Sequence, residues 1–292
     1  MVKLKILTDD EYQLSVTAYK AKHALSHTVI VNCATGVKQR FYSNFAKYLS
    51  QQGFDVFTYD YRGIGESRPK HLRALHADFK DWAQLDFAAV VTYAQRELPS
   101  NKLSVIGHSL GGQLPGLTSA SMSVDHFVLV GSQTPYWKNY NGFMKAKVWL
   151  LWHVLIPVLT ALFGYFPSRL LGLFEDLPKG AAQQWARWGK CRRYMFDEYP
   201  HARLQFETLA QPALVFNFSD DALAPAAAVA DLMRFYANLV KEKYHIEPAE
   251  IGRKQIGHFN FFKNEFCNPF WITVTQWLIE KGRSQRQPSR AA

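Results

Sequence analysis

The stretch from residue 103 to residue 113, LSVIGHSLGGQ, places one serine between two glycines directly after an apolar run. It fits the pattern G-x-S-x-G, in which a strand turns sharply into a helix and holds the serine in a strained backbone conformation. We expect Gly107 and Gly111 to make room, because a Cβ at either position would collide with the neighbouring strand or helix. Ser109 would then stand exposed at the carboxyl edge of a sheet and at a helix N-terminus, with the N–H of Leu110 ready to receive an oxyanion. The competing interpretation is a glycine-rich turn that only packs, so the decision depends on partner residues.

A serine hydroxyl becomes a nucleophile only beside a base, and the base needs an orienting carboxylate. After a turn of this kind, the expected chain order is serine, acid, histidine. Residues 212 to 225, PALVFNFSDDALAP, form an apolar strand-like run that ends in Asp220 and Asp221. We favour Asp221, which stands four residues before Pro225, and keep Asp220 as the alternative. Both acids can instead cap a helix that begins near Pro225.

The base is predicted to be His258, in the stretch QIGHFNFF from residue 255 to residue 262. The chain has ten histidines, and a lone histidine is usually an ordinary surface or core side chain. His258 differs from the others because it lies in a loop after the candidate acid and near the end of the chain. It therefore satisfies both the expected order and the expected context.

A second oxyanion donor is expected from the loop after the third strand. The run from Thr28 to Val31 is typical of that strand, and the loop that follows reads NCATG, from residue 32 to residue 36. We predict the N–H of Ala34 as the donor, with Thr35 as the next choice. The oxyanion hole would then consist of the N–H groups of Leu110 and Ala34.

These motifs resemble those of the α/β-hydrolase superfamily, especially its lid-bearing serine hydrolases of the esterase, lipase and acylglycerol-lipase kind. The motifs are GHSLGG, DYRGIGES at residues 60 to 67, the SDD loop and the late GH, and the chain is most similar to a branch known only as predicted α/β hydrolases. The position of Asp221 before Pro225 is similar to the acid loop of many such hydrolases. In the DYRGIGES turn the resemblance implies a structural role for Asp60 and Arg62 beside the nucleophile. One departure is that the usual His-Gly pair of the oxyanion loop is replaced by Asn32-Cys33.

The resemblance implies the α/β-hydrolase fold: a mostly parallel eight-stranded sheet flanked by helices, with a helical lid inserted after the sixth strand. The alternation of strand-like and helix-like segments agrees with an α/β class. We predict a hydrolase core at residues 1–134 and 209–280, a lid at 135–208 and a basic flexible tail at 281–292. Predicted strands are 3–7, 12–18, 28–31, 54–59, 103–106, 127–130 and 213–218, and predicted helices are 41–52, 77–96, 231–240 and 272–279, with another beginning near 113.

Composition limits the class of protein further. The chain has 292 residues with 48% hydrophobic content, enough for one α/β domain with an insertion and a large core. Its three cysteines are widely spaced, and neither a disulfide framework nor a metal-ligand spacing is present. The segment MVKLK leads into alternation rather than an apolar run, so no signal peptide is expected. We predict a cytoplasmic protein that uses no cofactor and no metal.

The predicted lid is apolar, basic and rich in tryptophan. It holds five of the eight tryptophans, and residues 148 to 166, VWLLWHVLIPVLTALFGYF, contain no charge. From residue 132 to residue 200, nine Lys or Arg against four Asp or Glu give a net charge of +5. Three interpretations compete: a lid that packs on the core and lines an apolar acyl pocket, peripheral contact with a membrane surface, and a membrane-spanning helix. Pro157 and His153 argue against a spanning helix, and no binding motif favours nucleic acid.

The functional prediction is a serine hydrolase that cleaves a carboxylic ester or thioester with an apolar acyl group through an acyl-enzyme. Its catalytic residues would be Ser109, Asp221 and His258. The alternatives are another hydrolase chemistry of the same fold, such as a peptidase or a C–C hydrolase, and a catalytically silent protein that binds a ligand or a membrane surface. The sequence does not choose among substrates.

Overall fold

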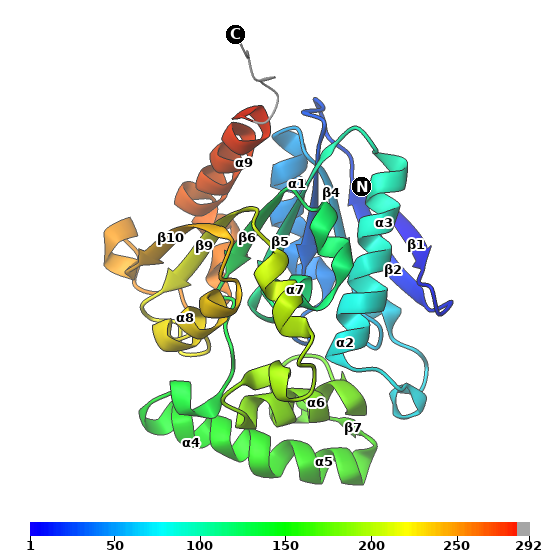
Figure 1. Cartoon of the computed structure of the whole chain (residues 1–292), viewed down its shortest axis with the longest axis vertical. Helices are drawn as coiled ribbons and strands as arrows, with labels where there is room; N and C mark the ends of the chain where they lie inside the picture. Colours follow the sequence, from blue (N-terminus) through cyan, green and yellow to red (C-terminus); the bar gives the residue numbers. More distant parts are fainter. Residues whose placement is uncertain (285–292) are drawn as a thin grey trace.

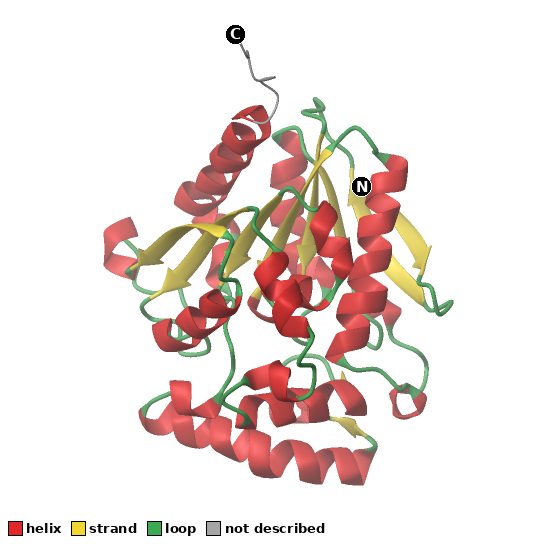
Figure 2. Ribbon diagram, viewed as in Figure 1, coloured by secondary structure: helices red, strands yellow, loops and turns green. Residues whose placement is uncertain are grey.

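An eight-stranded sheet forms the centre of the computed structural model, which describes residues 1–284 (Figure 1, Figure 2). The strand order is β1-β2-β4-β3-β5-β6-β9-β10; β1 and β2 are antiparallel to their neighbours and the rest of the sheet is parallel. The predicted mostly parallel eight-stranded sheet is thus confirmed. Its strands are β1 (Val2–Leu7), β2 (Gln13–Tyr19), β3 (His27–Asn32), β4 (Asp55–Tyr59), β5 (Lys102–His108), β6 (His126–Val130), β9 (Pro212–Phe218) and β10 (Val240–Ile246).

Helices cover both faces of the sheet (Figure 2). On one face α1 lies beside the start of α9, where the rings of Phe45 and Trp271 are 5.3 Å apart; α3 and α8 lie on the other face (Figure 1). The helices are α1 (Ser43–Gln51), α2 (Phe79–Asp81), α3 (Ala88–Glu97), α4 (Gly142–Leu150), α5 (Ile156–Phe163), α6 (Lys179–Lys190), α7 (Ala202–Thr208), α8 (Ala226–Phe235) and α9 (Ile272–Ser284). Because β3, β5, β6 and β9 are parallel, the loops after them meet at one edge of the sheet, where the candidate residues lie.

Two predictions near the C-terminus are wrong. The helix predicted at 231–240 is α8, which ends at Phe235, and the missed strand β10 begins at Val240. β10 is the last strand of the sheet, and its residues VKEKYHI are mostly exposed, so they lack the apolar pattern of a buried strand. The predicted tail begins too early, because α9 continues to Ser284; the rest of that tail, 285–292, lies outside the described residues.

The helix predicted to follow Ser109 is also absent from the described structure. Short 3₁₀ turns occupy Ser109–Gly112, Leu114–Leu117 and Ser119–Ser123 instead. Pro115 lacks an N–H and the neighbouring glycines favour other conformations, so the segment does not propagate an α-helix. Helix α7 covers these turns, and the Phe206 ring lies against Gly116.

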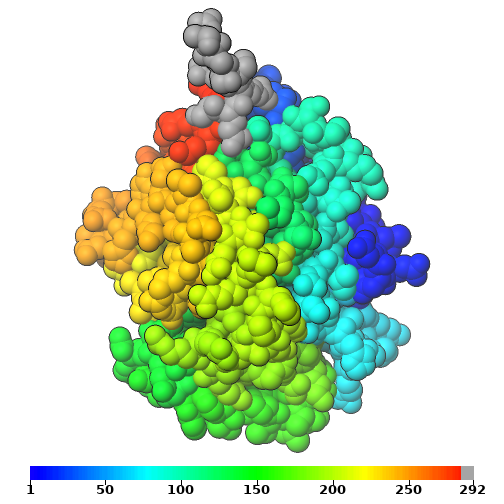
Figure 3. All heavy atoms as spheres, in the orientation of Figure 1, coloured from blue at the N-terminus to red at the C-terminus, as the bar shows by residue number. Residues whose placement is uncertain are grey.

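A helical insertion (residues 135–208) connects β6 to β9 and forms a layer at one end of the molecule, beyond the carboxyl ends of the parallel strands (Figure 1). Helix α4, a π-helical turn at Leu151–Leu155 and α5 make one continuous run, Gly142–Phe163, with α6 packed against it. The short strands β7 (Tyr165–Phe166) and β8 (Leu177–Pro178) form a hairpin beside it. Figure 3 shows the insertion, in green and yellow-green, closing against the core. Its boundaries as a separate unit stay a prediction, since α7 packs on the core.

Candidate active site

Ser109 stands on a strained turn between β5 and the first 3₁₀ turn. Its φ is +54°, a left-handed conformation that a residue with a side chain rarely adopts. The flanking glycines are required by contact: a Cβ on Gly107 would lie 2.5 Å from the Cα of Gly112, and one on Gly111 would lie 2.2 Å from the carbonyl oxygen of Asn32. This confirms the predicted reason for both glycines. Ser109 is 8% exposed, so it is nearly covered rather than open to solvent.

His258 and Asp221 come together from two different loops at the same edge. Nδ1 of His258 lies 2.7 Å from Oδ2 of Asp221, and both side chains are buried. The other carboxylate oxygen, Oδ1, accepts the N–H groups of Leu223 and Ala224, each at 2.9 Å. Asp221 is therefore fixed by its own loop while it faces the imidazole. Among residues 1–284, the hydroxyl of Ser109 makes no hydrogen bond.

Asp220 has a different position from its neighbour. Its carboxylate accepts the N–H of Ile256 at 2.8 Å and the N–H of Gly257 at 3.0 Å, directly before His258. It thus fixes the backbone of the histidine loop, while Asp221 contacts the ring. The sequence presented the two acids as competitors for one role, and the structure gives each a separate set of partners.

A buried chain of hydrogen bonds, which the sequence did not suggest, joins three loops of the site. The N–H of Ala34 donates to the hydroxyl of Tyr42 at 2.9 Å, and that hydroxyl lies 2.8 Å from Nδ1 of His108. Nε2 of His108 lies 2.8 Å from the carbonyl oxygen of His258. A carbonyl only accepts, so His108 donates from Nε2 and accepts at Nδ1 from Tyr42. Burial lowers the pKa of His108 well below its ordinary value, which agrees with a neutral ring.

This chain affects the predicted oxyanion hole. The N–H of Ala34 is directed at the Tyr42 hydroxyl rather than toward a substrate. For Thr35, the second choice, no backbone hydrogen bond from its N–H is found among residues 1–284. Leu110 follows Ser109 at the start of the 3₁₀ turn, as expected for the first donor. The identity of the donors stays a prediction, and the geometry favours Thr35 over Ala34 for the second.

Asn32 and Cys33 stand where the resemblance implies a His-Gly pair, and their side chains contact groups in the protein interior. Nδ2 of Asn32 donates to the carbonyl oxygen of Gly111 at 3.2 Å, and its Oδ1 accepts the Tyr59 hydroxyl at 2.8 Å. Asn32 therefore connects β3 to Gly111, two residues after Ser109. Burial raises the pKa of the Cys33 thiol well above its ordinary value, so the group is a small buried side chain rather than a reactive thiolate.

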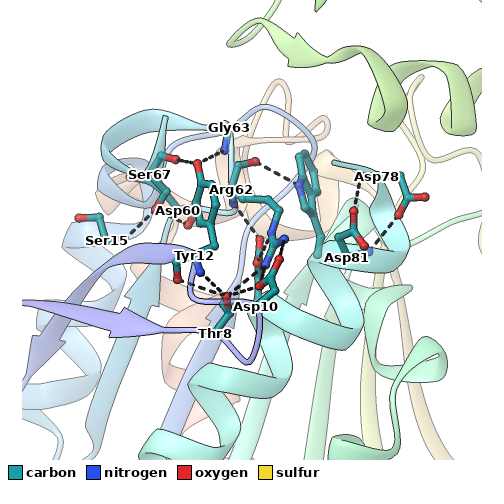
Figure 4. Close-up of polar contacts among 12 residues, drawn as sticks. Thr8, Asp10, Tyr12, Ser15, Asp60, Arg62, Gly63, Ser67, Asp78 and Asp81 are labelled. Atoms are coloured by element: carbon teal, nitrogen blue, oxygen red, sulfur yellow. Dashed lines mark hydrogen bonds and ion pairs between the residues drawn. The ribbon is translucent and has the colours of Figure 1, made fainter. Parts of the chain in front are cut away.

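The DYRGIGES turn is built around the guanidinium of Arg62 (Figure 4). Arg62 donates from Nε to Asp86 at 2.6 Å and from its terminal nitrogens to Asp10 at 2.7 and 2.9 Å, and it lies 4.9 Å from the ring centre of Tyr12. The indole of Trp82 donates to the Arg62 carbonyl at 3.2 Å. Burial raises the pKa of Asp86 to about 7, although contact with Arg62 opposes that shift. The buried cation is thus enclosed by carboxylates and aromatic rings.

Asp60 connects this turn to the segment that follows the oxyanion loop. Its carboxylate accepts the backbone N–H of Gln39 at 2.8 Å and the N–H of Glu66 at 2.9 Å. The hydroxyl of Ser67 donates to the Asp60 carbonyl at 2.7 Å, closing the turn (Figure 4). The structural role implied for Asp60 and Arg62 is consistent with these contacts.

The insertion closes over the candidate site through the loop after β3. The N–H of Glu175 donates to the carbonyl oxygen of Gly36 at 3.0 Å, and the Glu175 carboxylate lies 2.7 Å from Nζ of Lys38. The Phe174 side chain packs on Gly36 at the same place. On the other side, the Tyr194 hydroxyl donates to Gln113 at 2.6 Å, four residues after Ser109. The site is therefore covered in this conformation.

No group of three or more His, Cys, Asp or Glu side chains that could hold a metal ion is found in the described part of the chain, residues 1–284. The residues gathered at the edge of the sheet are those of nucleophilic acyl chemistry: a hydroxyl, an imidazole and a carboxylate.

Part of the chain matches a known protein family. A family model described as "Serine aminopeptidase, S33" matches residues 26–168, which contain the candidate oxyanion loop, the DYRGIGES turn and Ser109. The match ends inside the insertion, before the loops of Asp221 and His258.

Solved structures are similar over nearly the whole chain. An esterase from Pyrococcus furiosus is 15% identical, with 97% of this chain and 91% of that chain covered and a TM-score of 0.59. An esterase from Exiguobacterium antarcticum is 15% identical, with 97% and 100% covered and a TM-score of 0.59. A monoacylglycerol lipase from Paleococcus ferrophilus is 16% identical, with 92% and 99% covered and a TM-score of 0.59. At these identities the likeness is one of fold.

Proposed function

We propose that this chain, which has the α/β-hydrolase fold, is a serine hydrolase that cleaves a carboxylic ester or thioester with an apolar acyl group. The observation that carries the proposal is the 2.7 Å contact between Asp221 and His258 at the edge where Ser109 occupies its strained turn. A residue held at φ +54° between two obligatory glycines is costly for the fold, and such strain is concentrated at functional sites.

The reaction proceeds in two acyl-transfer steps. Oγ of Ser109 attacks the carbonyl carbon while Nε2 of His258 takes the hydroxyl proton, and Asp221 stabilises the imidazolium through Nδ1–H. The N–H groups of Leu110 and Thr35, with Ala34 as the alternative to Thr35, hold the oxyanion of the tetrahedral intermediate. His258 returns the proton to the leaving alcohol or thiol, which gives the acyl-enzyme. Water, deprotonated by His258, then releases the acid and restores Ser109.

The positioning contacts support this role for the imidazole. Asp220 fixes the backbone before His258 through two N–H groups, and His108 fixes its carbonyl oxygen. A ring held on both sides of its Cα in this way keeps its Nε2 in one place, which general-base catalysis requires.

An apolar acyl group is favoured by what covers the site. Phe174 of the insertion packs against the oxyanion loop at Gly36. The matching family is described as an aminopeptidase, and a peptide amine would need a free carboxylate beside the nucleophile. Glu175, the acid at that loop, is already paired with Lys38 and Arg169. An ester or thioester therefore fits better than the charged amine of a peptide.

The test is the intact mass of the protein after incubation with a fluorophosphonate probe, wild type beside Ser109→Ala. We expect one adduct on the wild type and none on the variant, with the same circular dichroism spectrum for both. A panel of p-nitrophenyl esters and aminoacyl-p-nitroanilides then separates esterase from aminopeptidase activity. An unlabelled wild type, or equal labelling of the variant, would contradict the proposal and bring the catalytically silent binding protein forward.

A further inference from the structure

One long helix of the insertion has an apolar face that no other part of residues 1–284 covers. The run Gly142–Phe163 is 22 residues long, and only 22% of its apolar window is buried. The inward face is the row Val148, Trp152, Ile156 and Thr160, all buried. The opposite face is exposed along its whole length, at Phe143 (76%), Leu150 (43%), Val154 (37%), Val158 (49%) and Leu162 (71%). By length and composition this helix could also cross a membrane.

The exposed face is a row of apolar side chains along one side of the helix rather than a single exposed residue. Single apolar residues on a protein surface are normal, whereas a contiguous apolar patch marks a site of interaction. Beyond the helix, Leu170 (73%) and Leu173 (52%) of the insertion are exposed as well. The run is the outermost layer of the insertion and lies at the end of the molecule opposite α9 (Figure 1).

The segment that carries this face has basic residues and no acidic ones. Between residues 135 and 174 the sequence has four Lys or Arg and no Asp or Glu. Three of the four are lysines at one end of the helix, and each lies over an aromatic ring. Lys138 and Lys145 are 5.3 and 5.5 Å from the ring centre of Trp137, and Lys147 is 4.5 Å from that of Phe143. An apolar stripe with lysines and aromatic rings beside it fits an anionic lipid surface.

The inward contacts require the helix to lie along such a surface rather than cross it. The indole of Trp152 donates to the Pro135 carbonyl at 3.0 Å and its ring lies 4.7 Å from that of Trp185. Nε2 of Gln183 in α6 donates to the Thr160 hydroxyl at 3.1 Å. A spanning orientation would either break these contacts or carry α6 into the lipid together with the helix.

We propose that the outer face of the Gly142–Phe163 helix is a docking surface for an anionic lipid bilayer, with the helix parallel to the membrane plane. Its apolar row enters the head-group region, and Lys138, Lys145 and Lys147 contact lipid phosphates. The binding is independent of the proposed hydrolysis. A second copy of this chain is the other occupant that such an apolar face admits, and the experiment separates the two.

The experiment is co-sedimentation of the full chain with vesicles of phosphatidylcholine alone and of phosphatidylcholine with 30% phosphatidylserine. One variant, Phe143→Ser/Leu150→Ser/Leu162→Ser, removes the apolar row. A second, Lys145→Glu/Lys147→Glu, reverses two charges. The matched controls are Leu204→Ser, at an exposed leucine of α7 (71%), and Lys20→Glu/Lys22→Glu, at exposed lysines after β2 at the opposite edge of the sheet. The basic residues from 281 to 292 are intact in every variant, so they do not account for a difference between them.

We expect the wild type to bind the anionic vesicles more tightly than the neutral ones. Each lysine near an anionic surface contributes about fivefold in partition, so the double reversal should weaken binding by at least roughly 25-fold. The apolar variant should lose binding to both vesicle types, and both controls should bind as the wild type does. Loss in the controls as well, or full binding by both helix variants, would overturn the proposal. So would a concentration-dependent dimer, measured by sedimentation velocity without lipid, that dissociates only in the apolar variant, because it would identify a second copy as the occupant.

Discussion

The DYRGIGES turn and the outer helix of the insertion depart from the usual distribution of residues in opposite directions. The turn buries a guanidinium, and Arg62 is 3% exposed. The helix exposes hydrocarbon side chains, and Leu162 is 71% exposed. A charge is costly inside a protein unless it is paired and hydrogen-bonded, and a contiguous apolar face is costly in water unless a partner covers it. Residues 1–284 meet the first requirement, and the same residues do not meet the second.

The two regions differ in where their interaction partners lie. Arg62 has Asp86, Asp10 and the Tyr12 ring around it, so the buried charge has its partners elsewhere in the same chain. Among residues 1–284, the outer helix has partners for its inward row only. Folding therefore supplies the partners of the buried charge, whereas we propose that a lipid surface outside the chain covers the exposed face of the helix.

The largest expected effect tests whether the acids of the core have separate roles. Asp221→Asn should lower kcat by about 10,000-fold, because the amide no longer stabilises the imidazolium or fixes the ring tautomer. Asp220→Asn should lower kcat by only about tenfold, because its Oδ1 still accepts one N–H of the histidine loop. Steady-state kinetics with the ester found in the panel measures both, and the pH dependence of kcat/KM should stay unchanged in Asp220→Asn. The reverse order of effects would move the catalytic acid to Asp220.

One leucine substitution in each region tests the comparison directly. Leu49 in α1 is fully buried, so Leu49→Ala should cost about 2–5 kcal/mol of the free energy of unfolding. Leu162→Ala, on the outer helix, should change it by no more than about 0.5 kcal/mol in the absence of lipid. Urea denaturation of the two variants beside the wild type gives both values. A cost at Leu162 similar to that at Leu49 would mean that its face is covered in solution, and the contrast between the regions would fail.

The smallest effect concerns the exposed partner of Arg62. The hydrogen bond from Arg62 lowers the pKa of Asp10 from 3.8 to about 2. Since the folded-state pKa is the lower one, this carboxylate stabilises the fold above about pH 4, and the contribution is lost as the pH falls from about 4 to about 2. Asp10 is partly exposed, with 44% of its side chain accessible, so the effect is weakened by solvent.

Asp10→Asn has a similar shape and no charge, and it isolates this contribution. The difference in urea midpoint between wild type and variant should be larger at pH 6 than at pH 2. Asp9→Asn is the matched control, since Asp9 is an exposed neighbour in the same turn. An equal difference at both pH values would show that the Arg62 contact adds no charge-dependent stability.

Much of the site could be predicted from the sequence because its motifs are local. Gly107, Ser109 and Gly111 lie within five residues, and the clash that forbids a Cβ involves the turn itself and the adjacent strand. The order of serine, acid and histidine follows the order of strands. The parallel sheet was predictable for the same reason, since β-branched and aromatic runs alternate with helical segments.

The features that the sequence did not reveal depend on distant partners or on context. The Tyr42–His108 hydrogen-bond chain joins residues whose separations in the sequence are 66 and 150 positions, so no local pattern predicts it. β10 is a charged strand at the edge of the sheet, and its pairing with β9 decides its structure. In place of the helix expected after Ser109, the structure has 3₁₀ turns covered by α7. Only tertiary packing decides between the two.

By itself, the sequence determined the strained turn at Ser109, the fold class and the region from which each candidate catalytic group comes. Short-range sterics and hydrophobic periodicity, which decide these features, act within a few residues. Tertiary structure alone decided how Asp220 and Asp221 divide their contacts, that Ala34 donates to Tyr42, and which face of the long helix stays exposed. Each of these depends on where a side chain meets atoms from another part of the chain, and the hydrogen-bond partners and burial that result are properties of the folded packing.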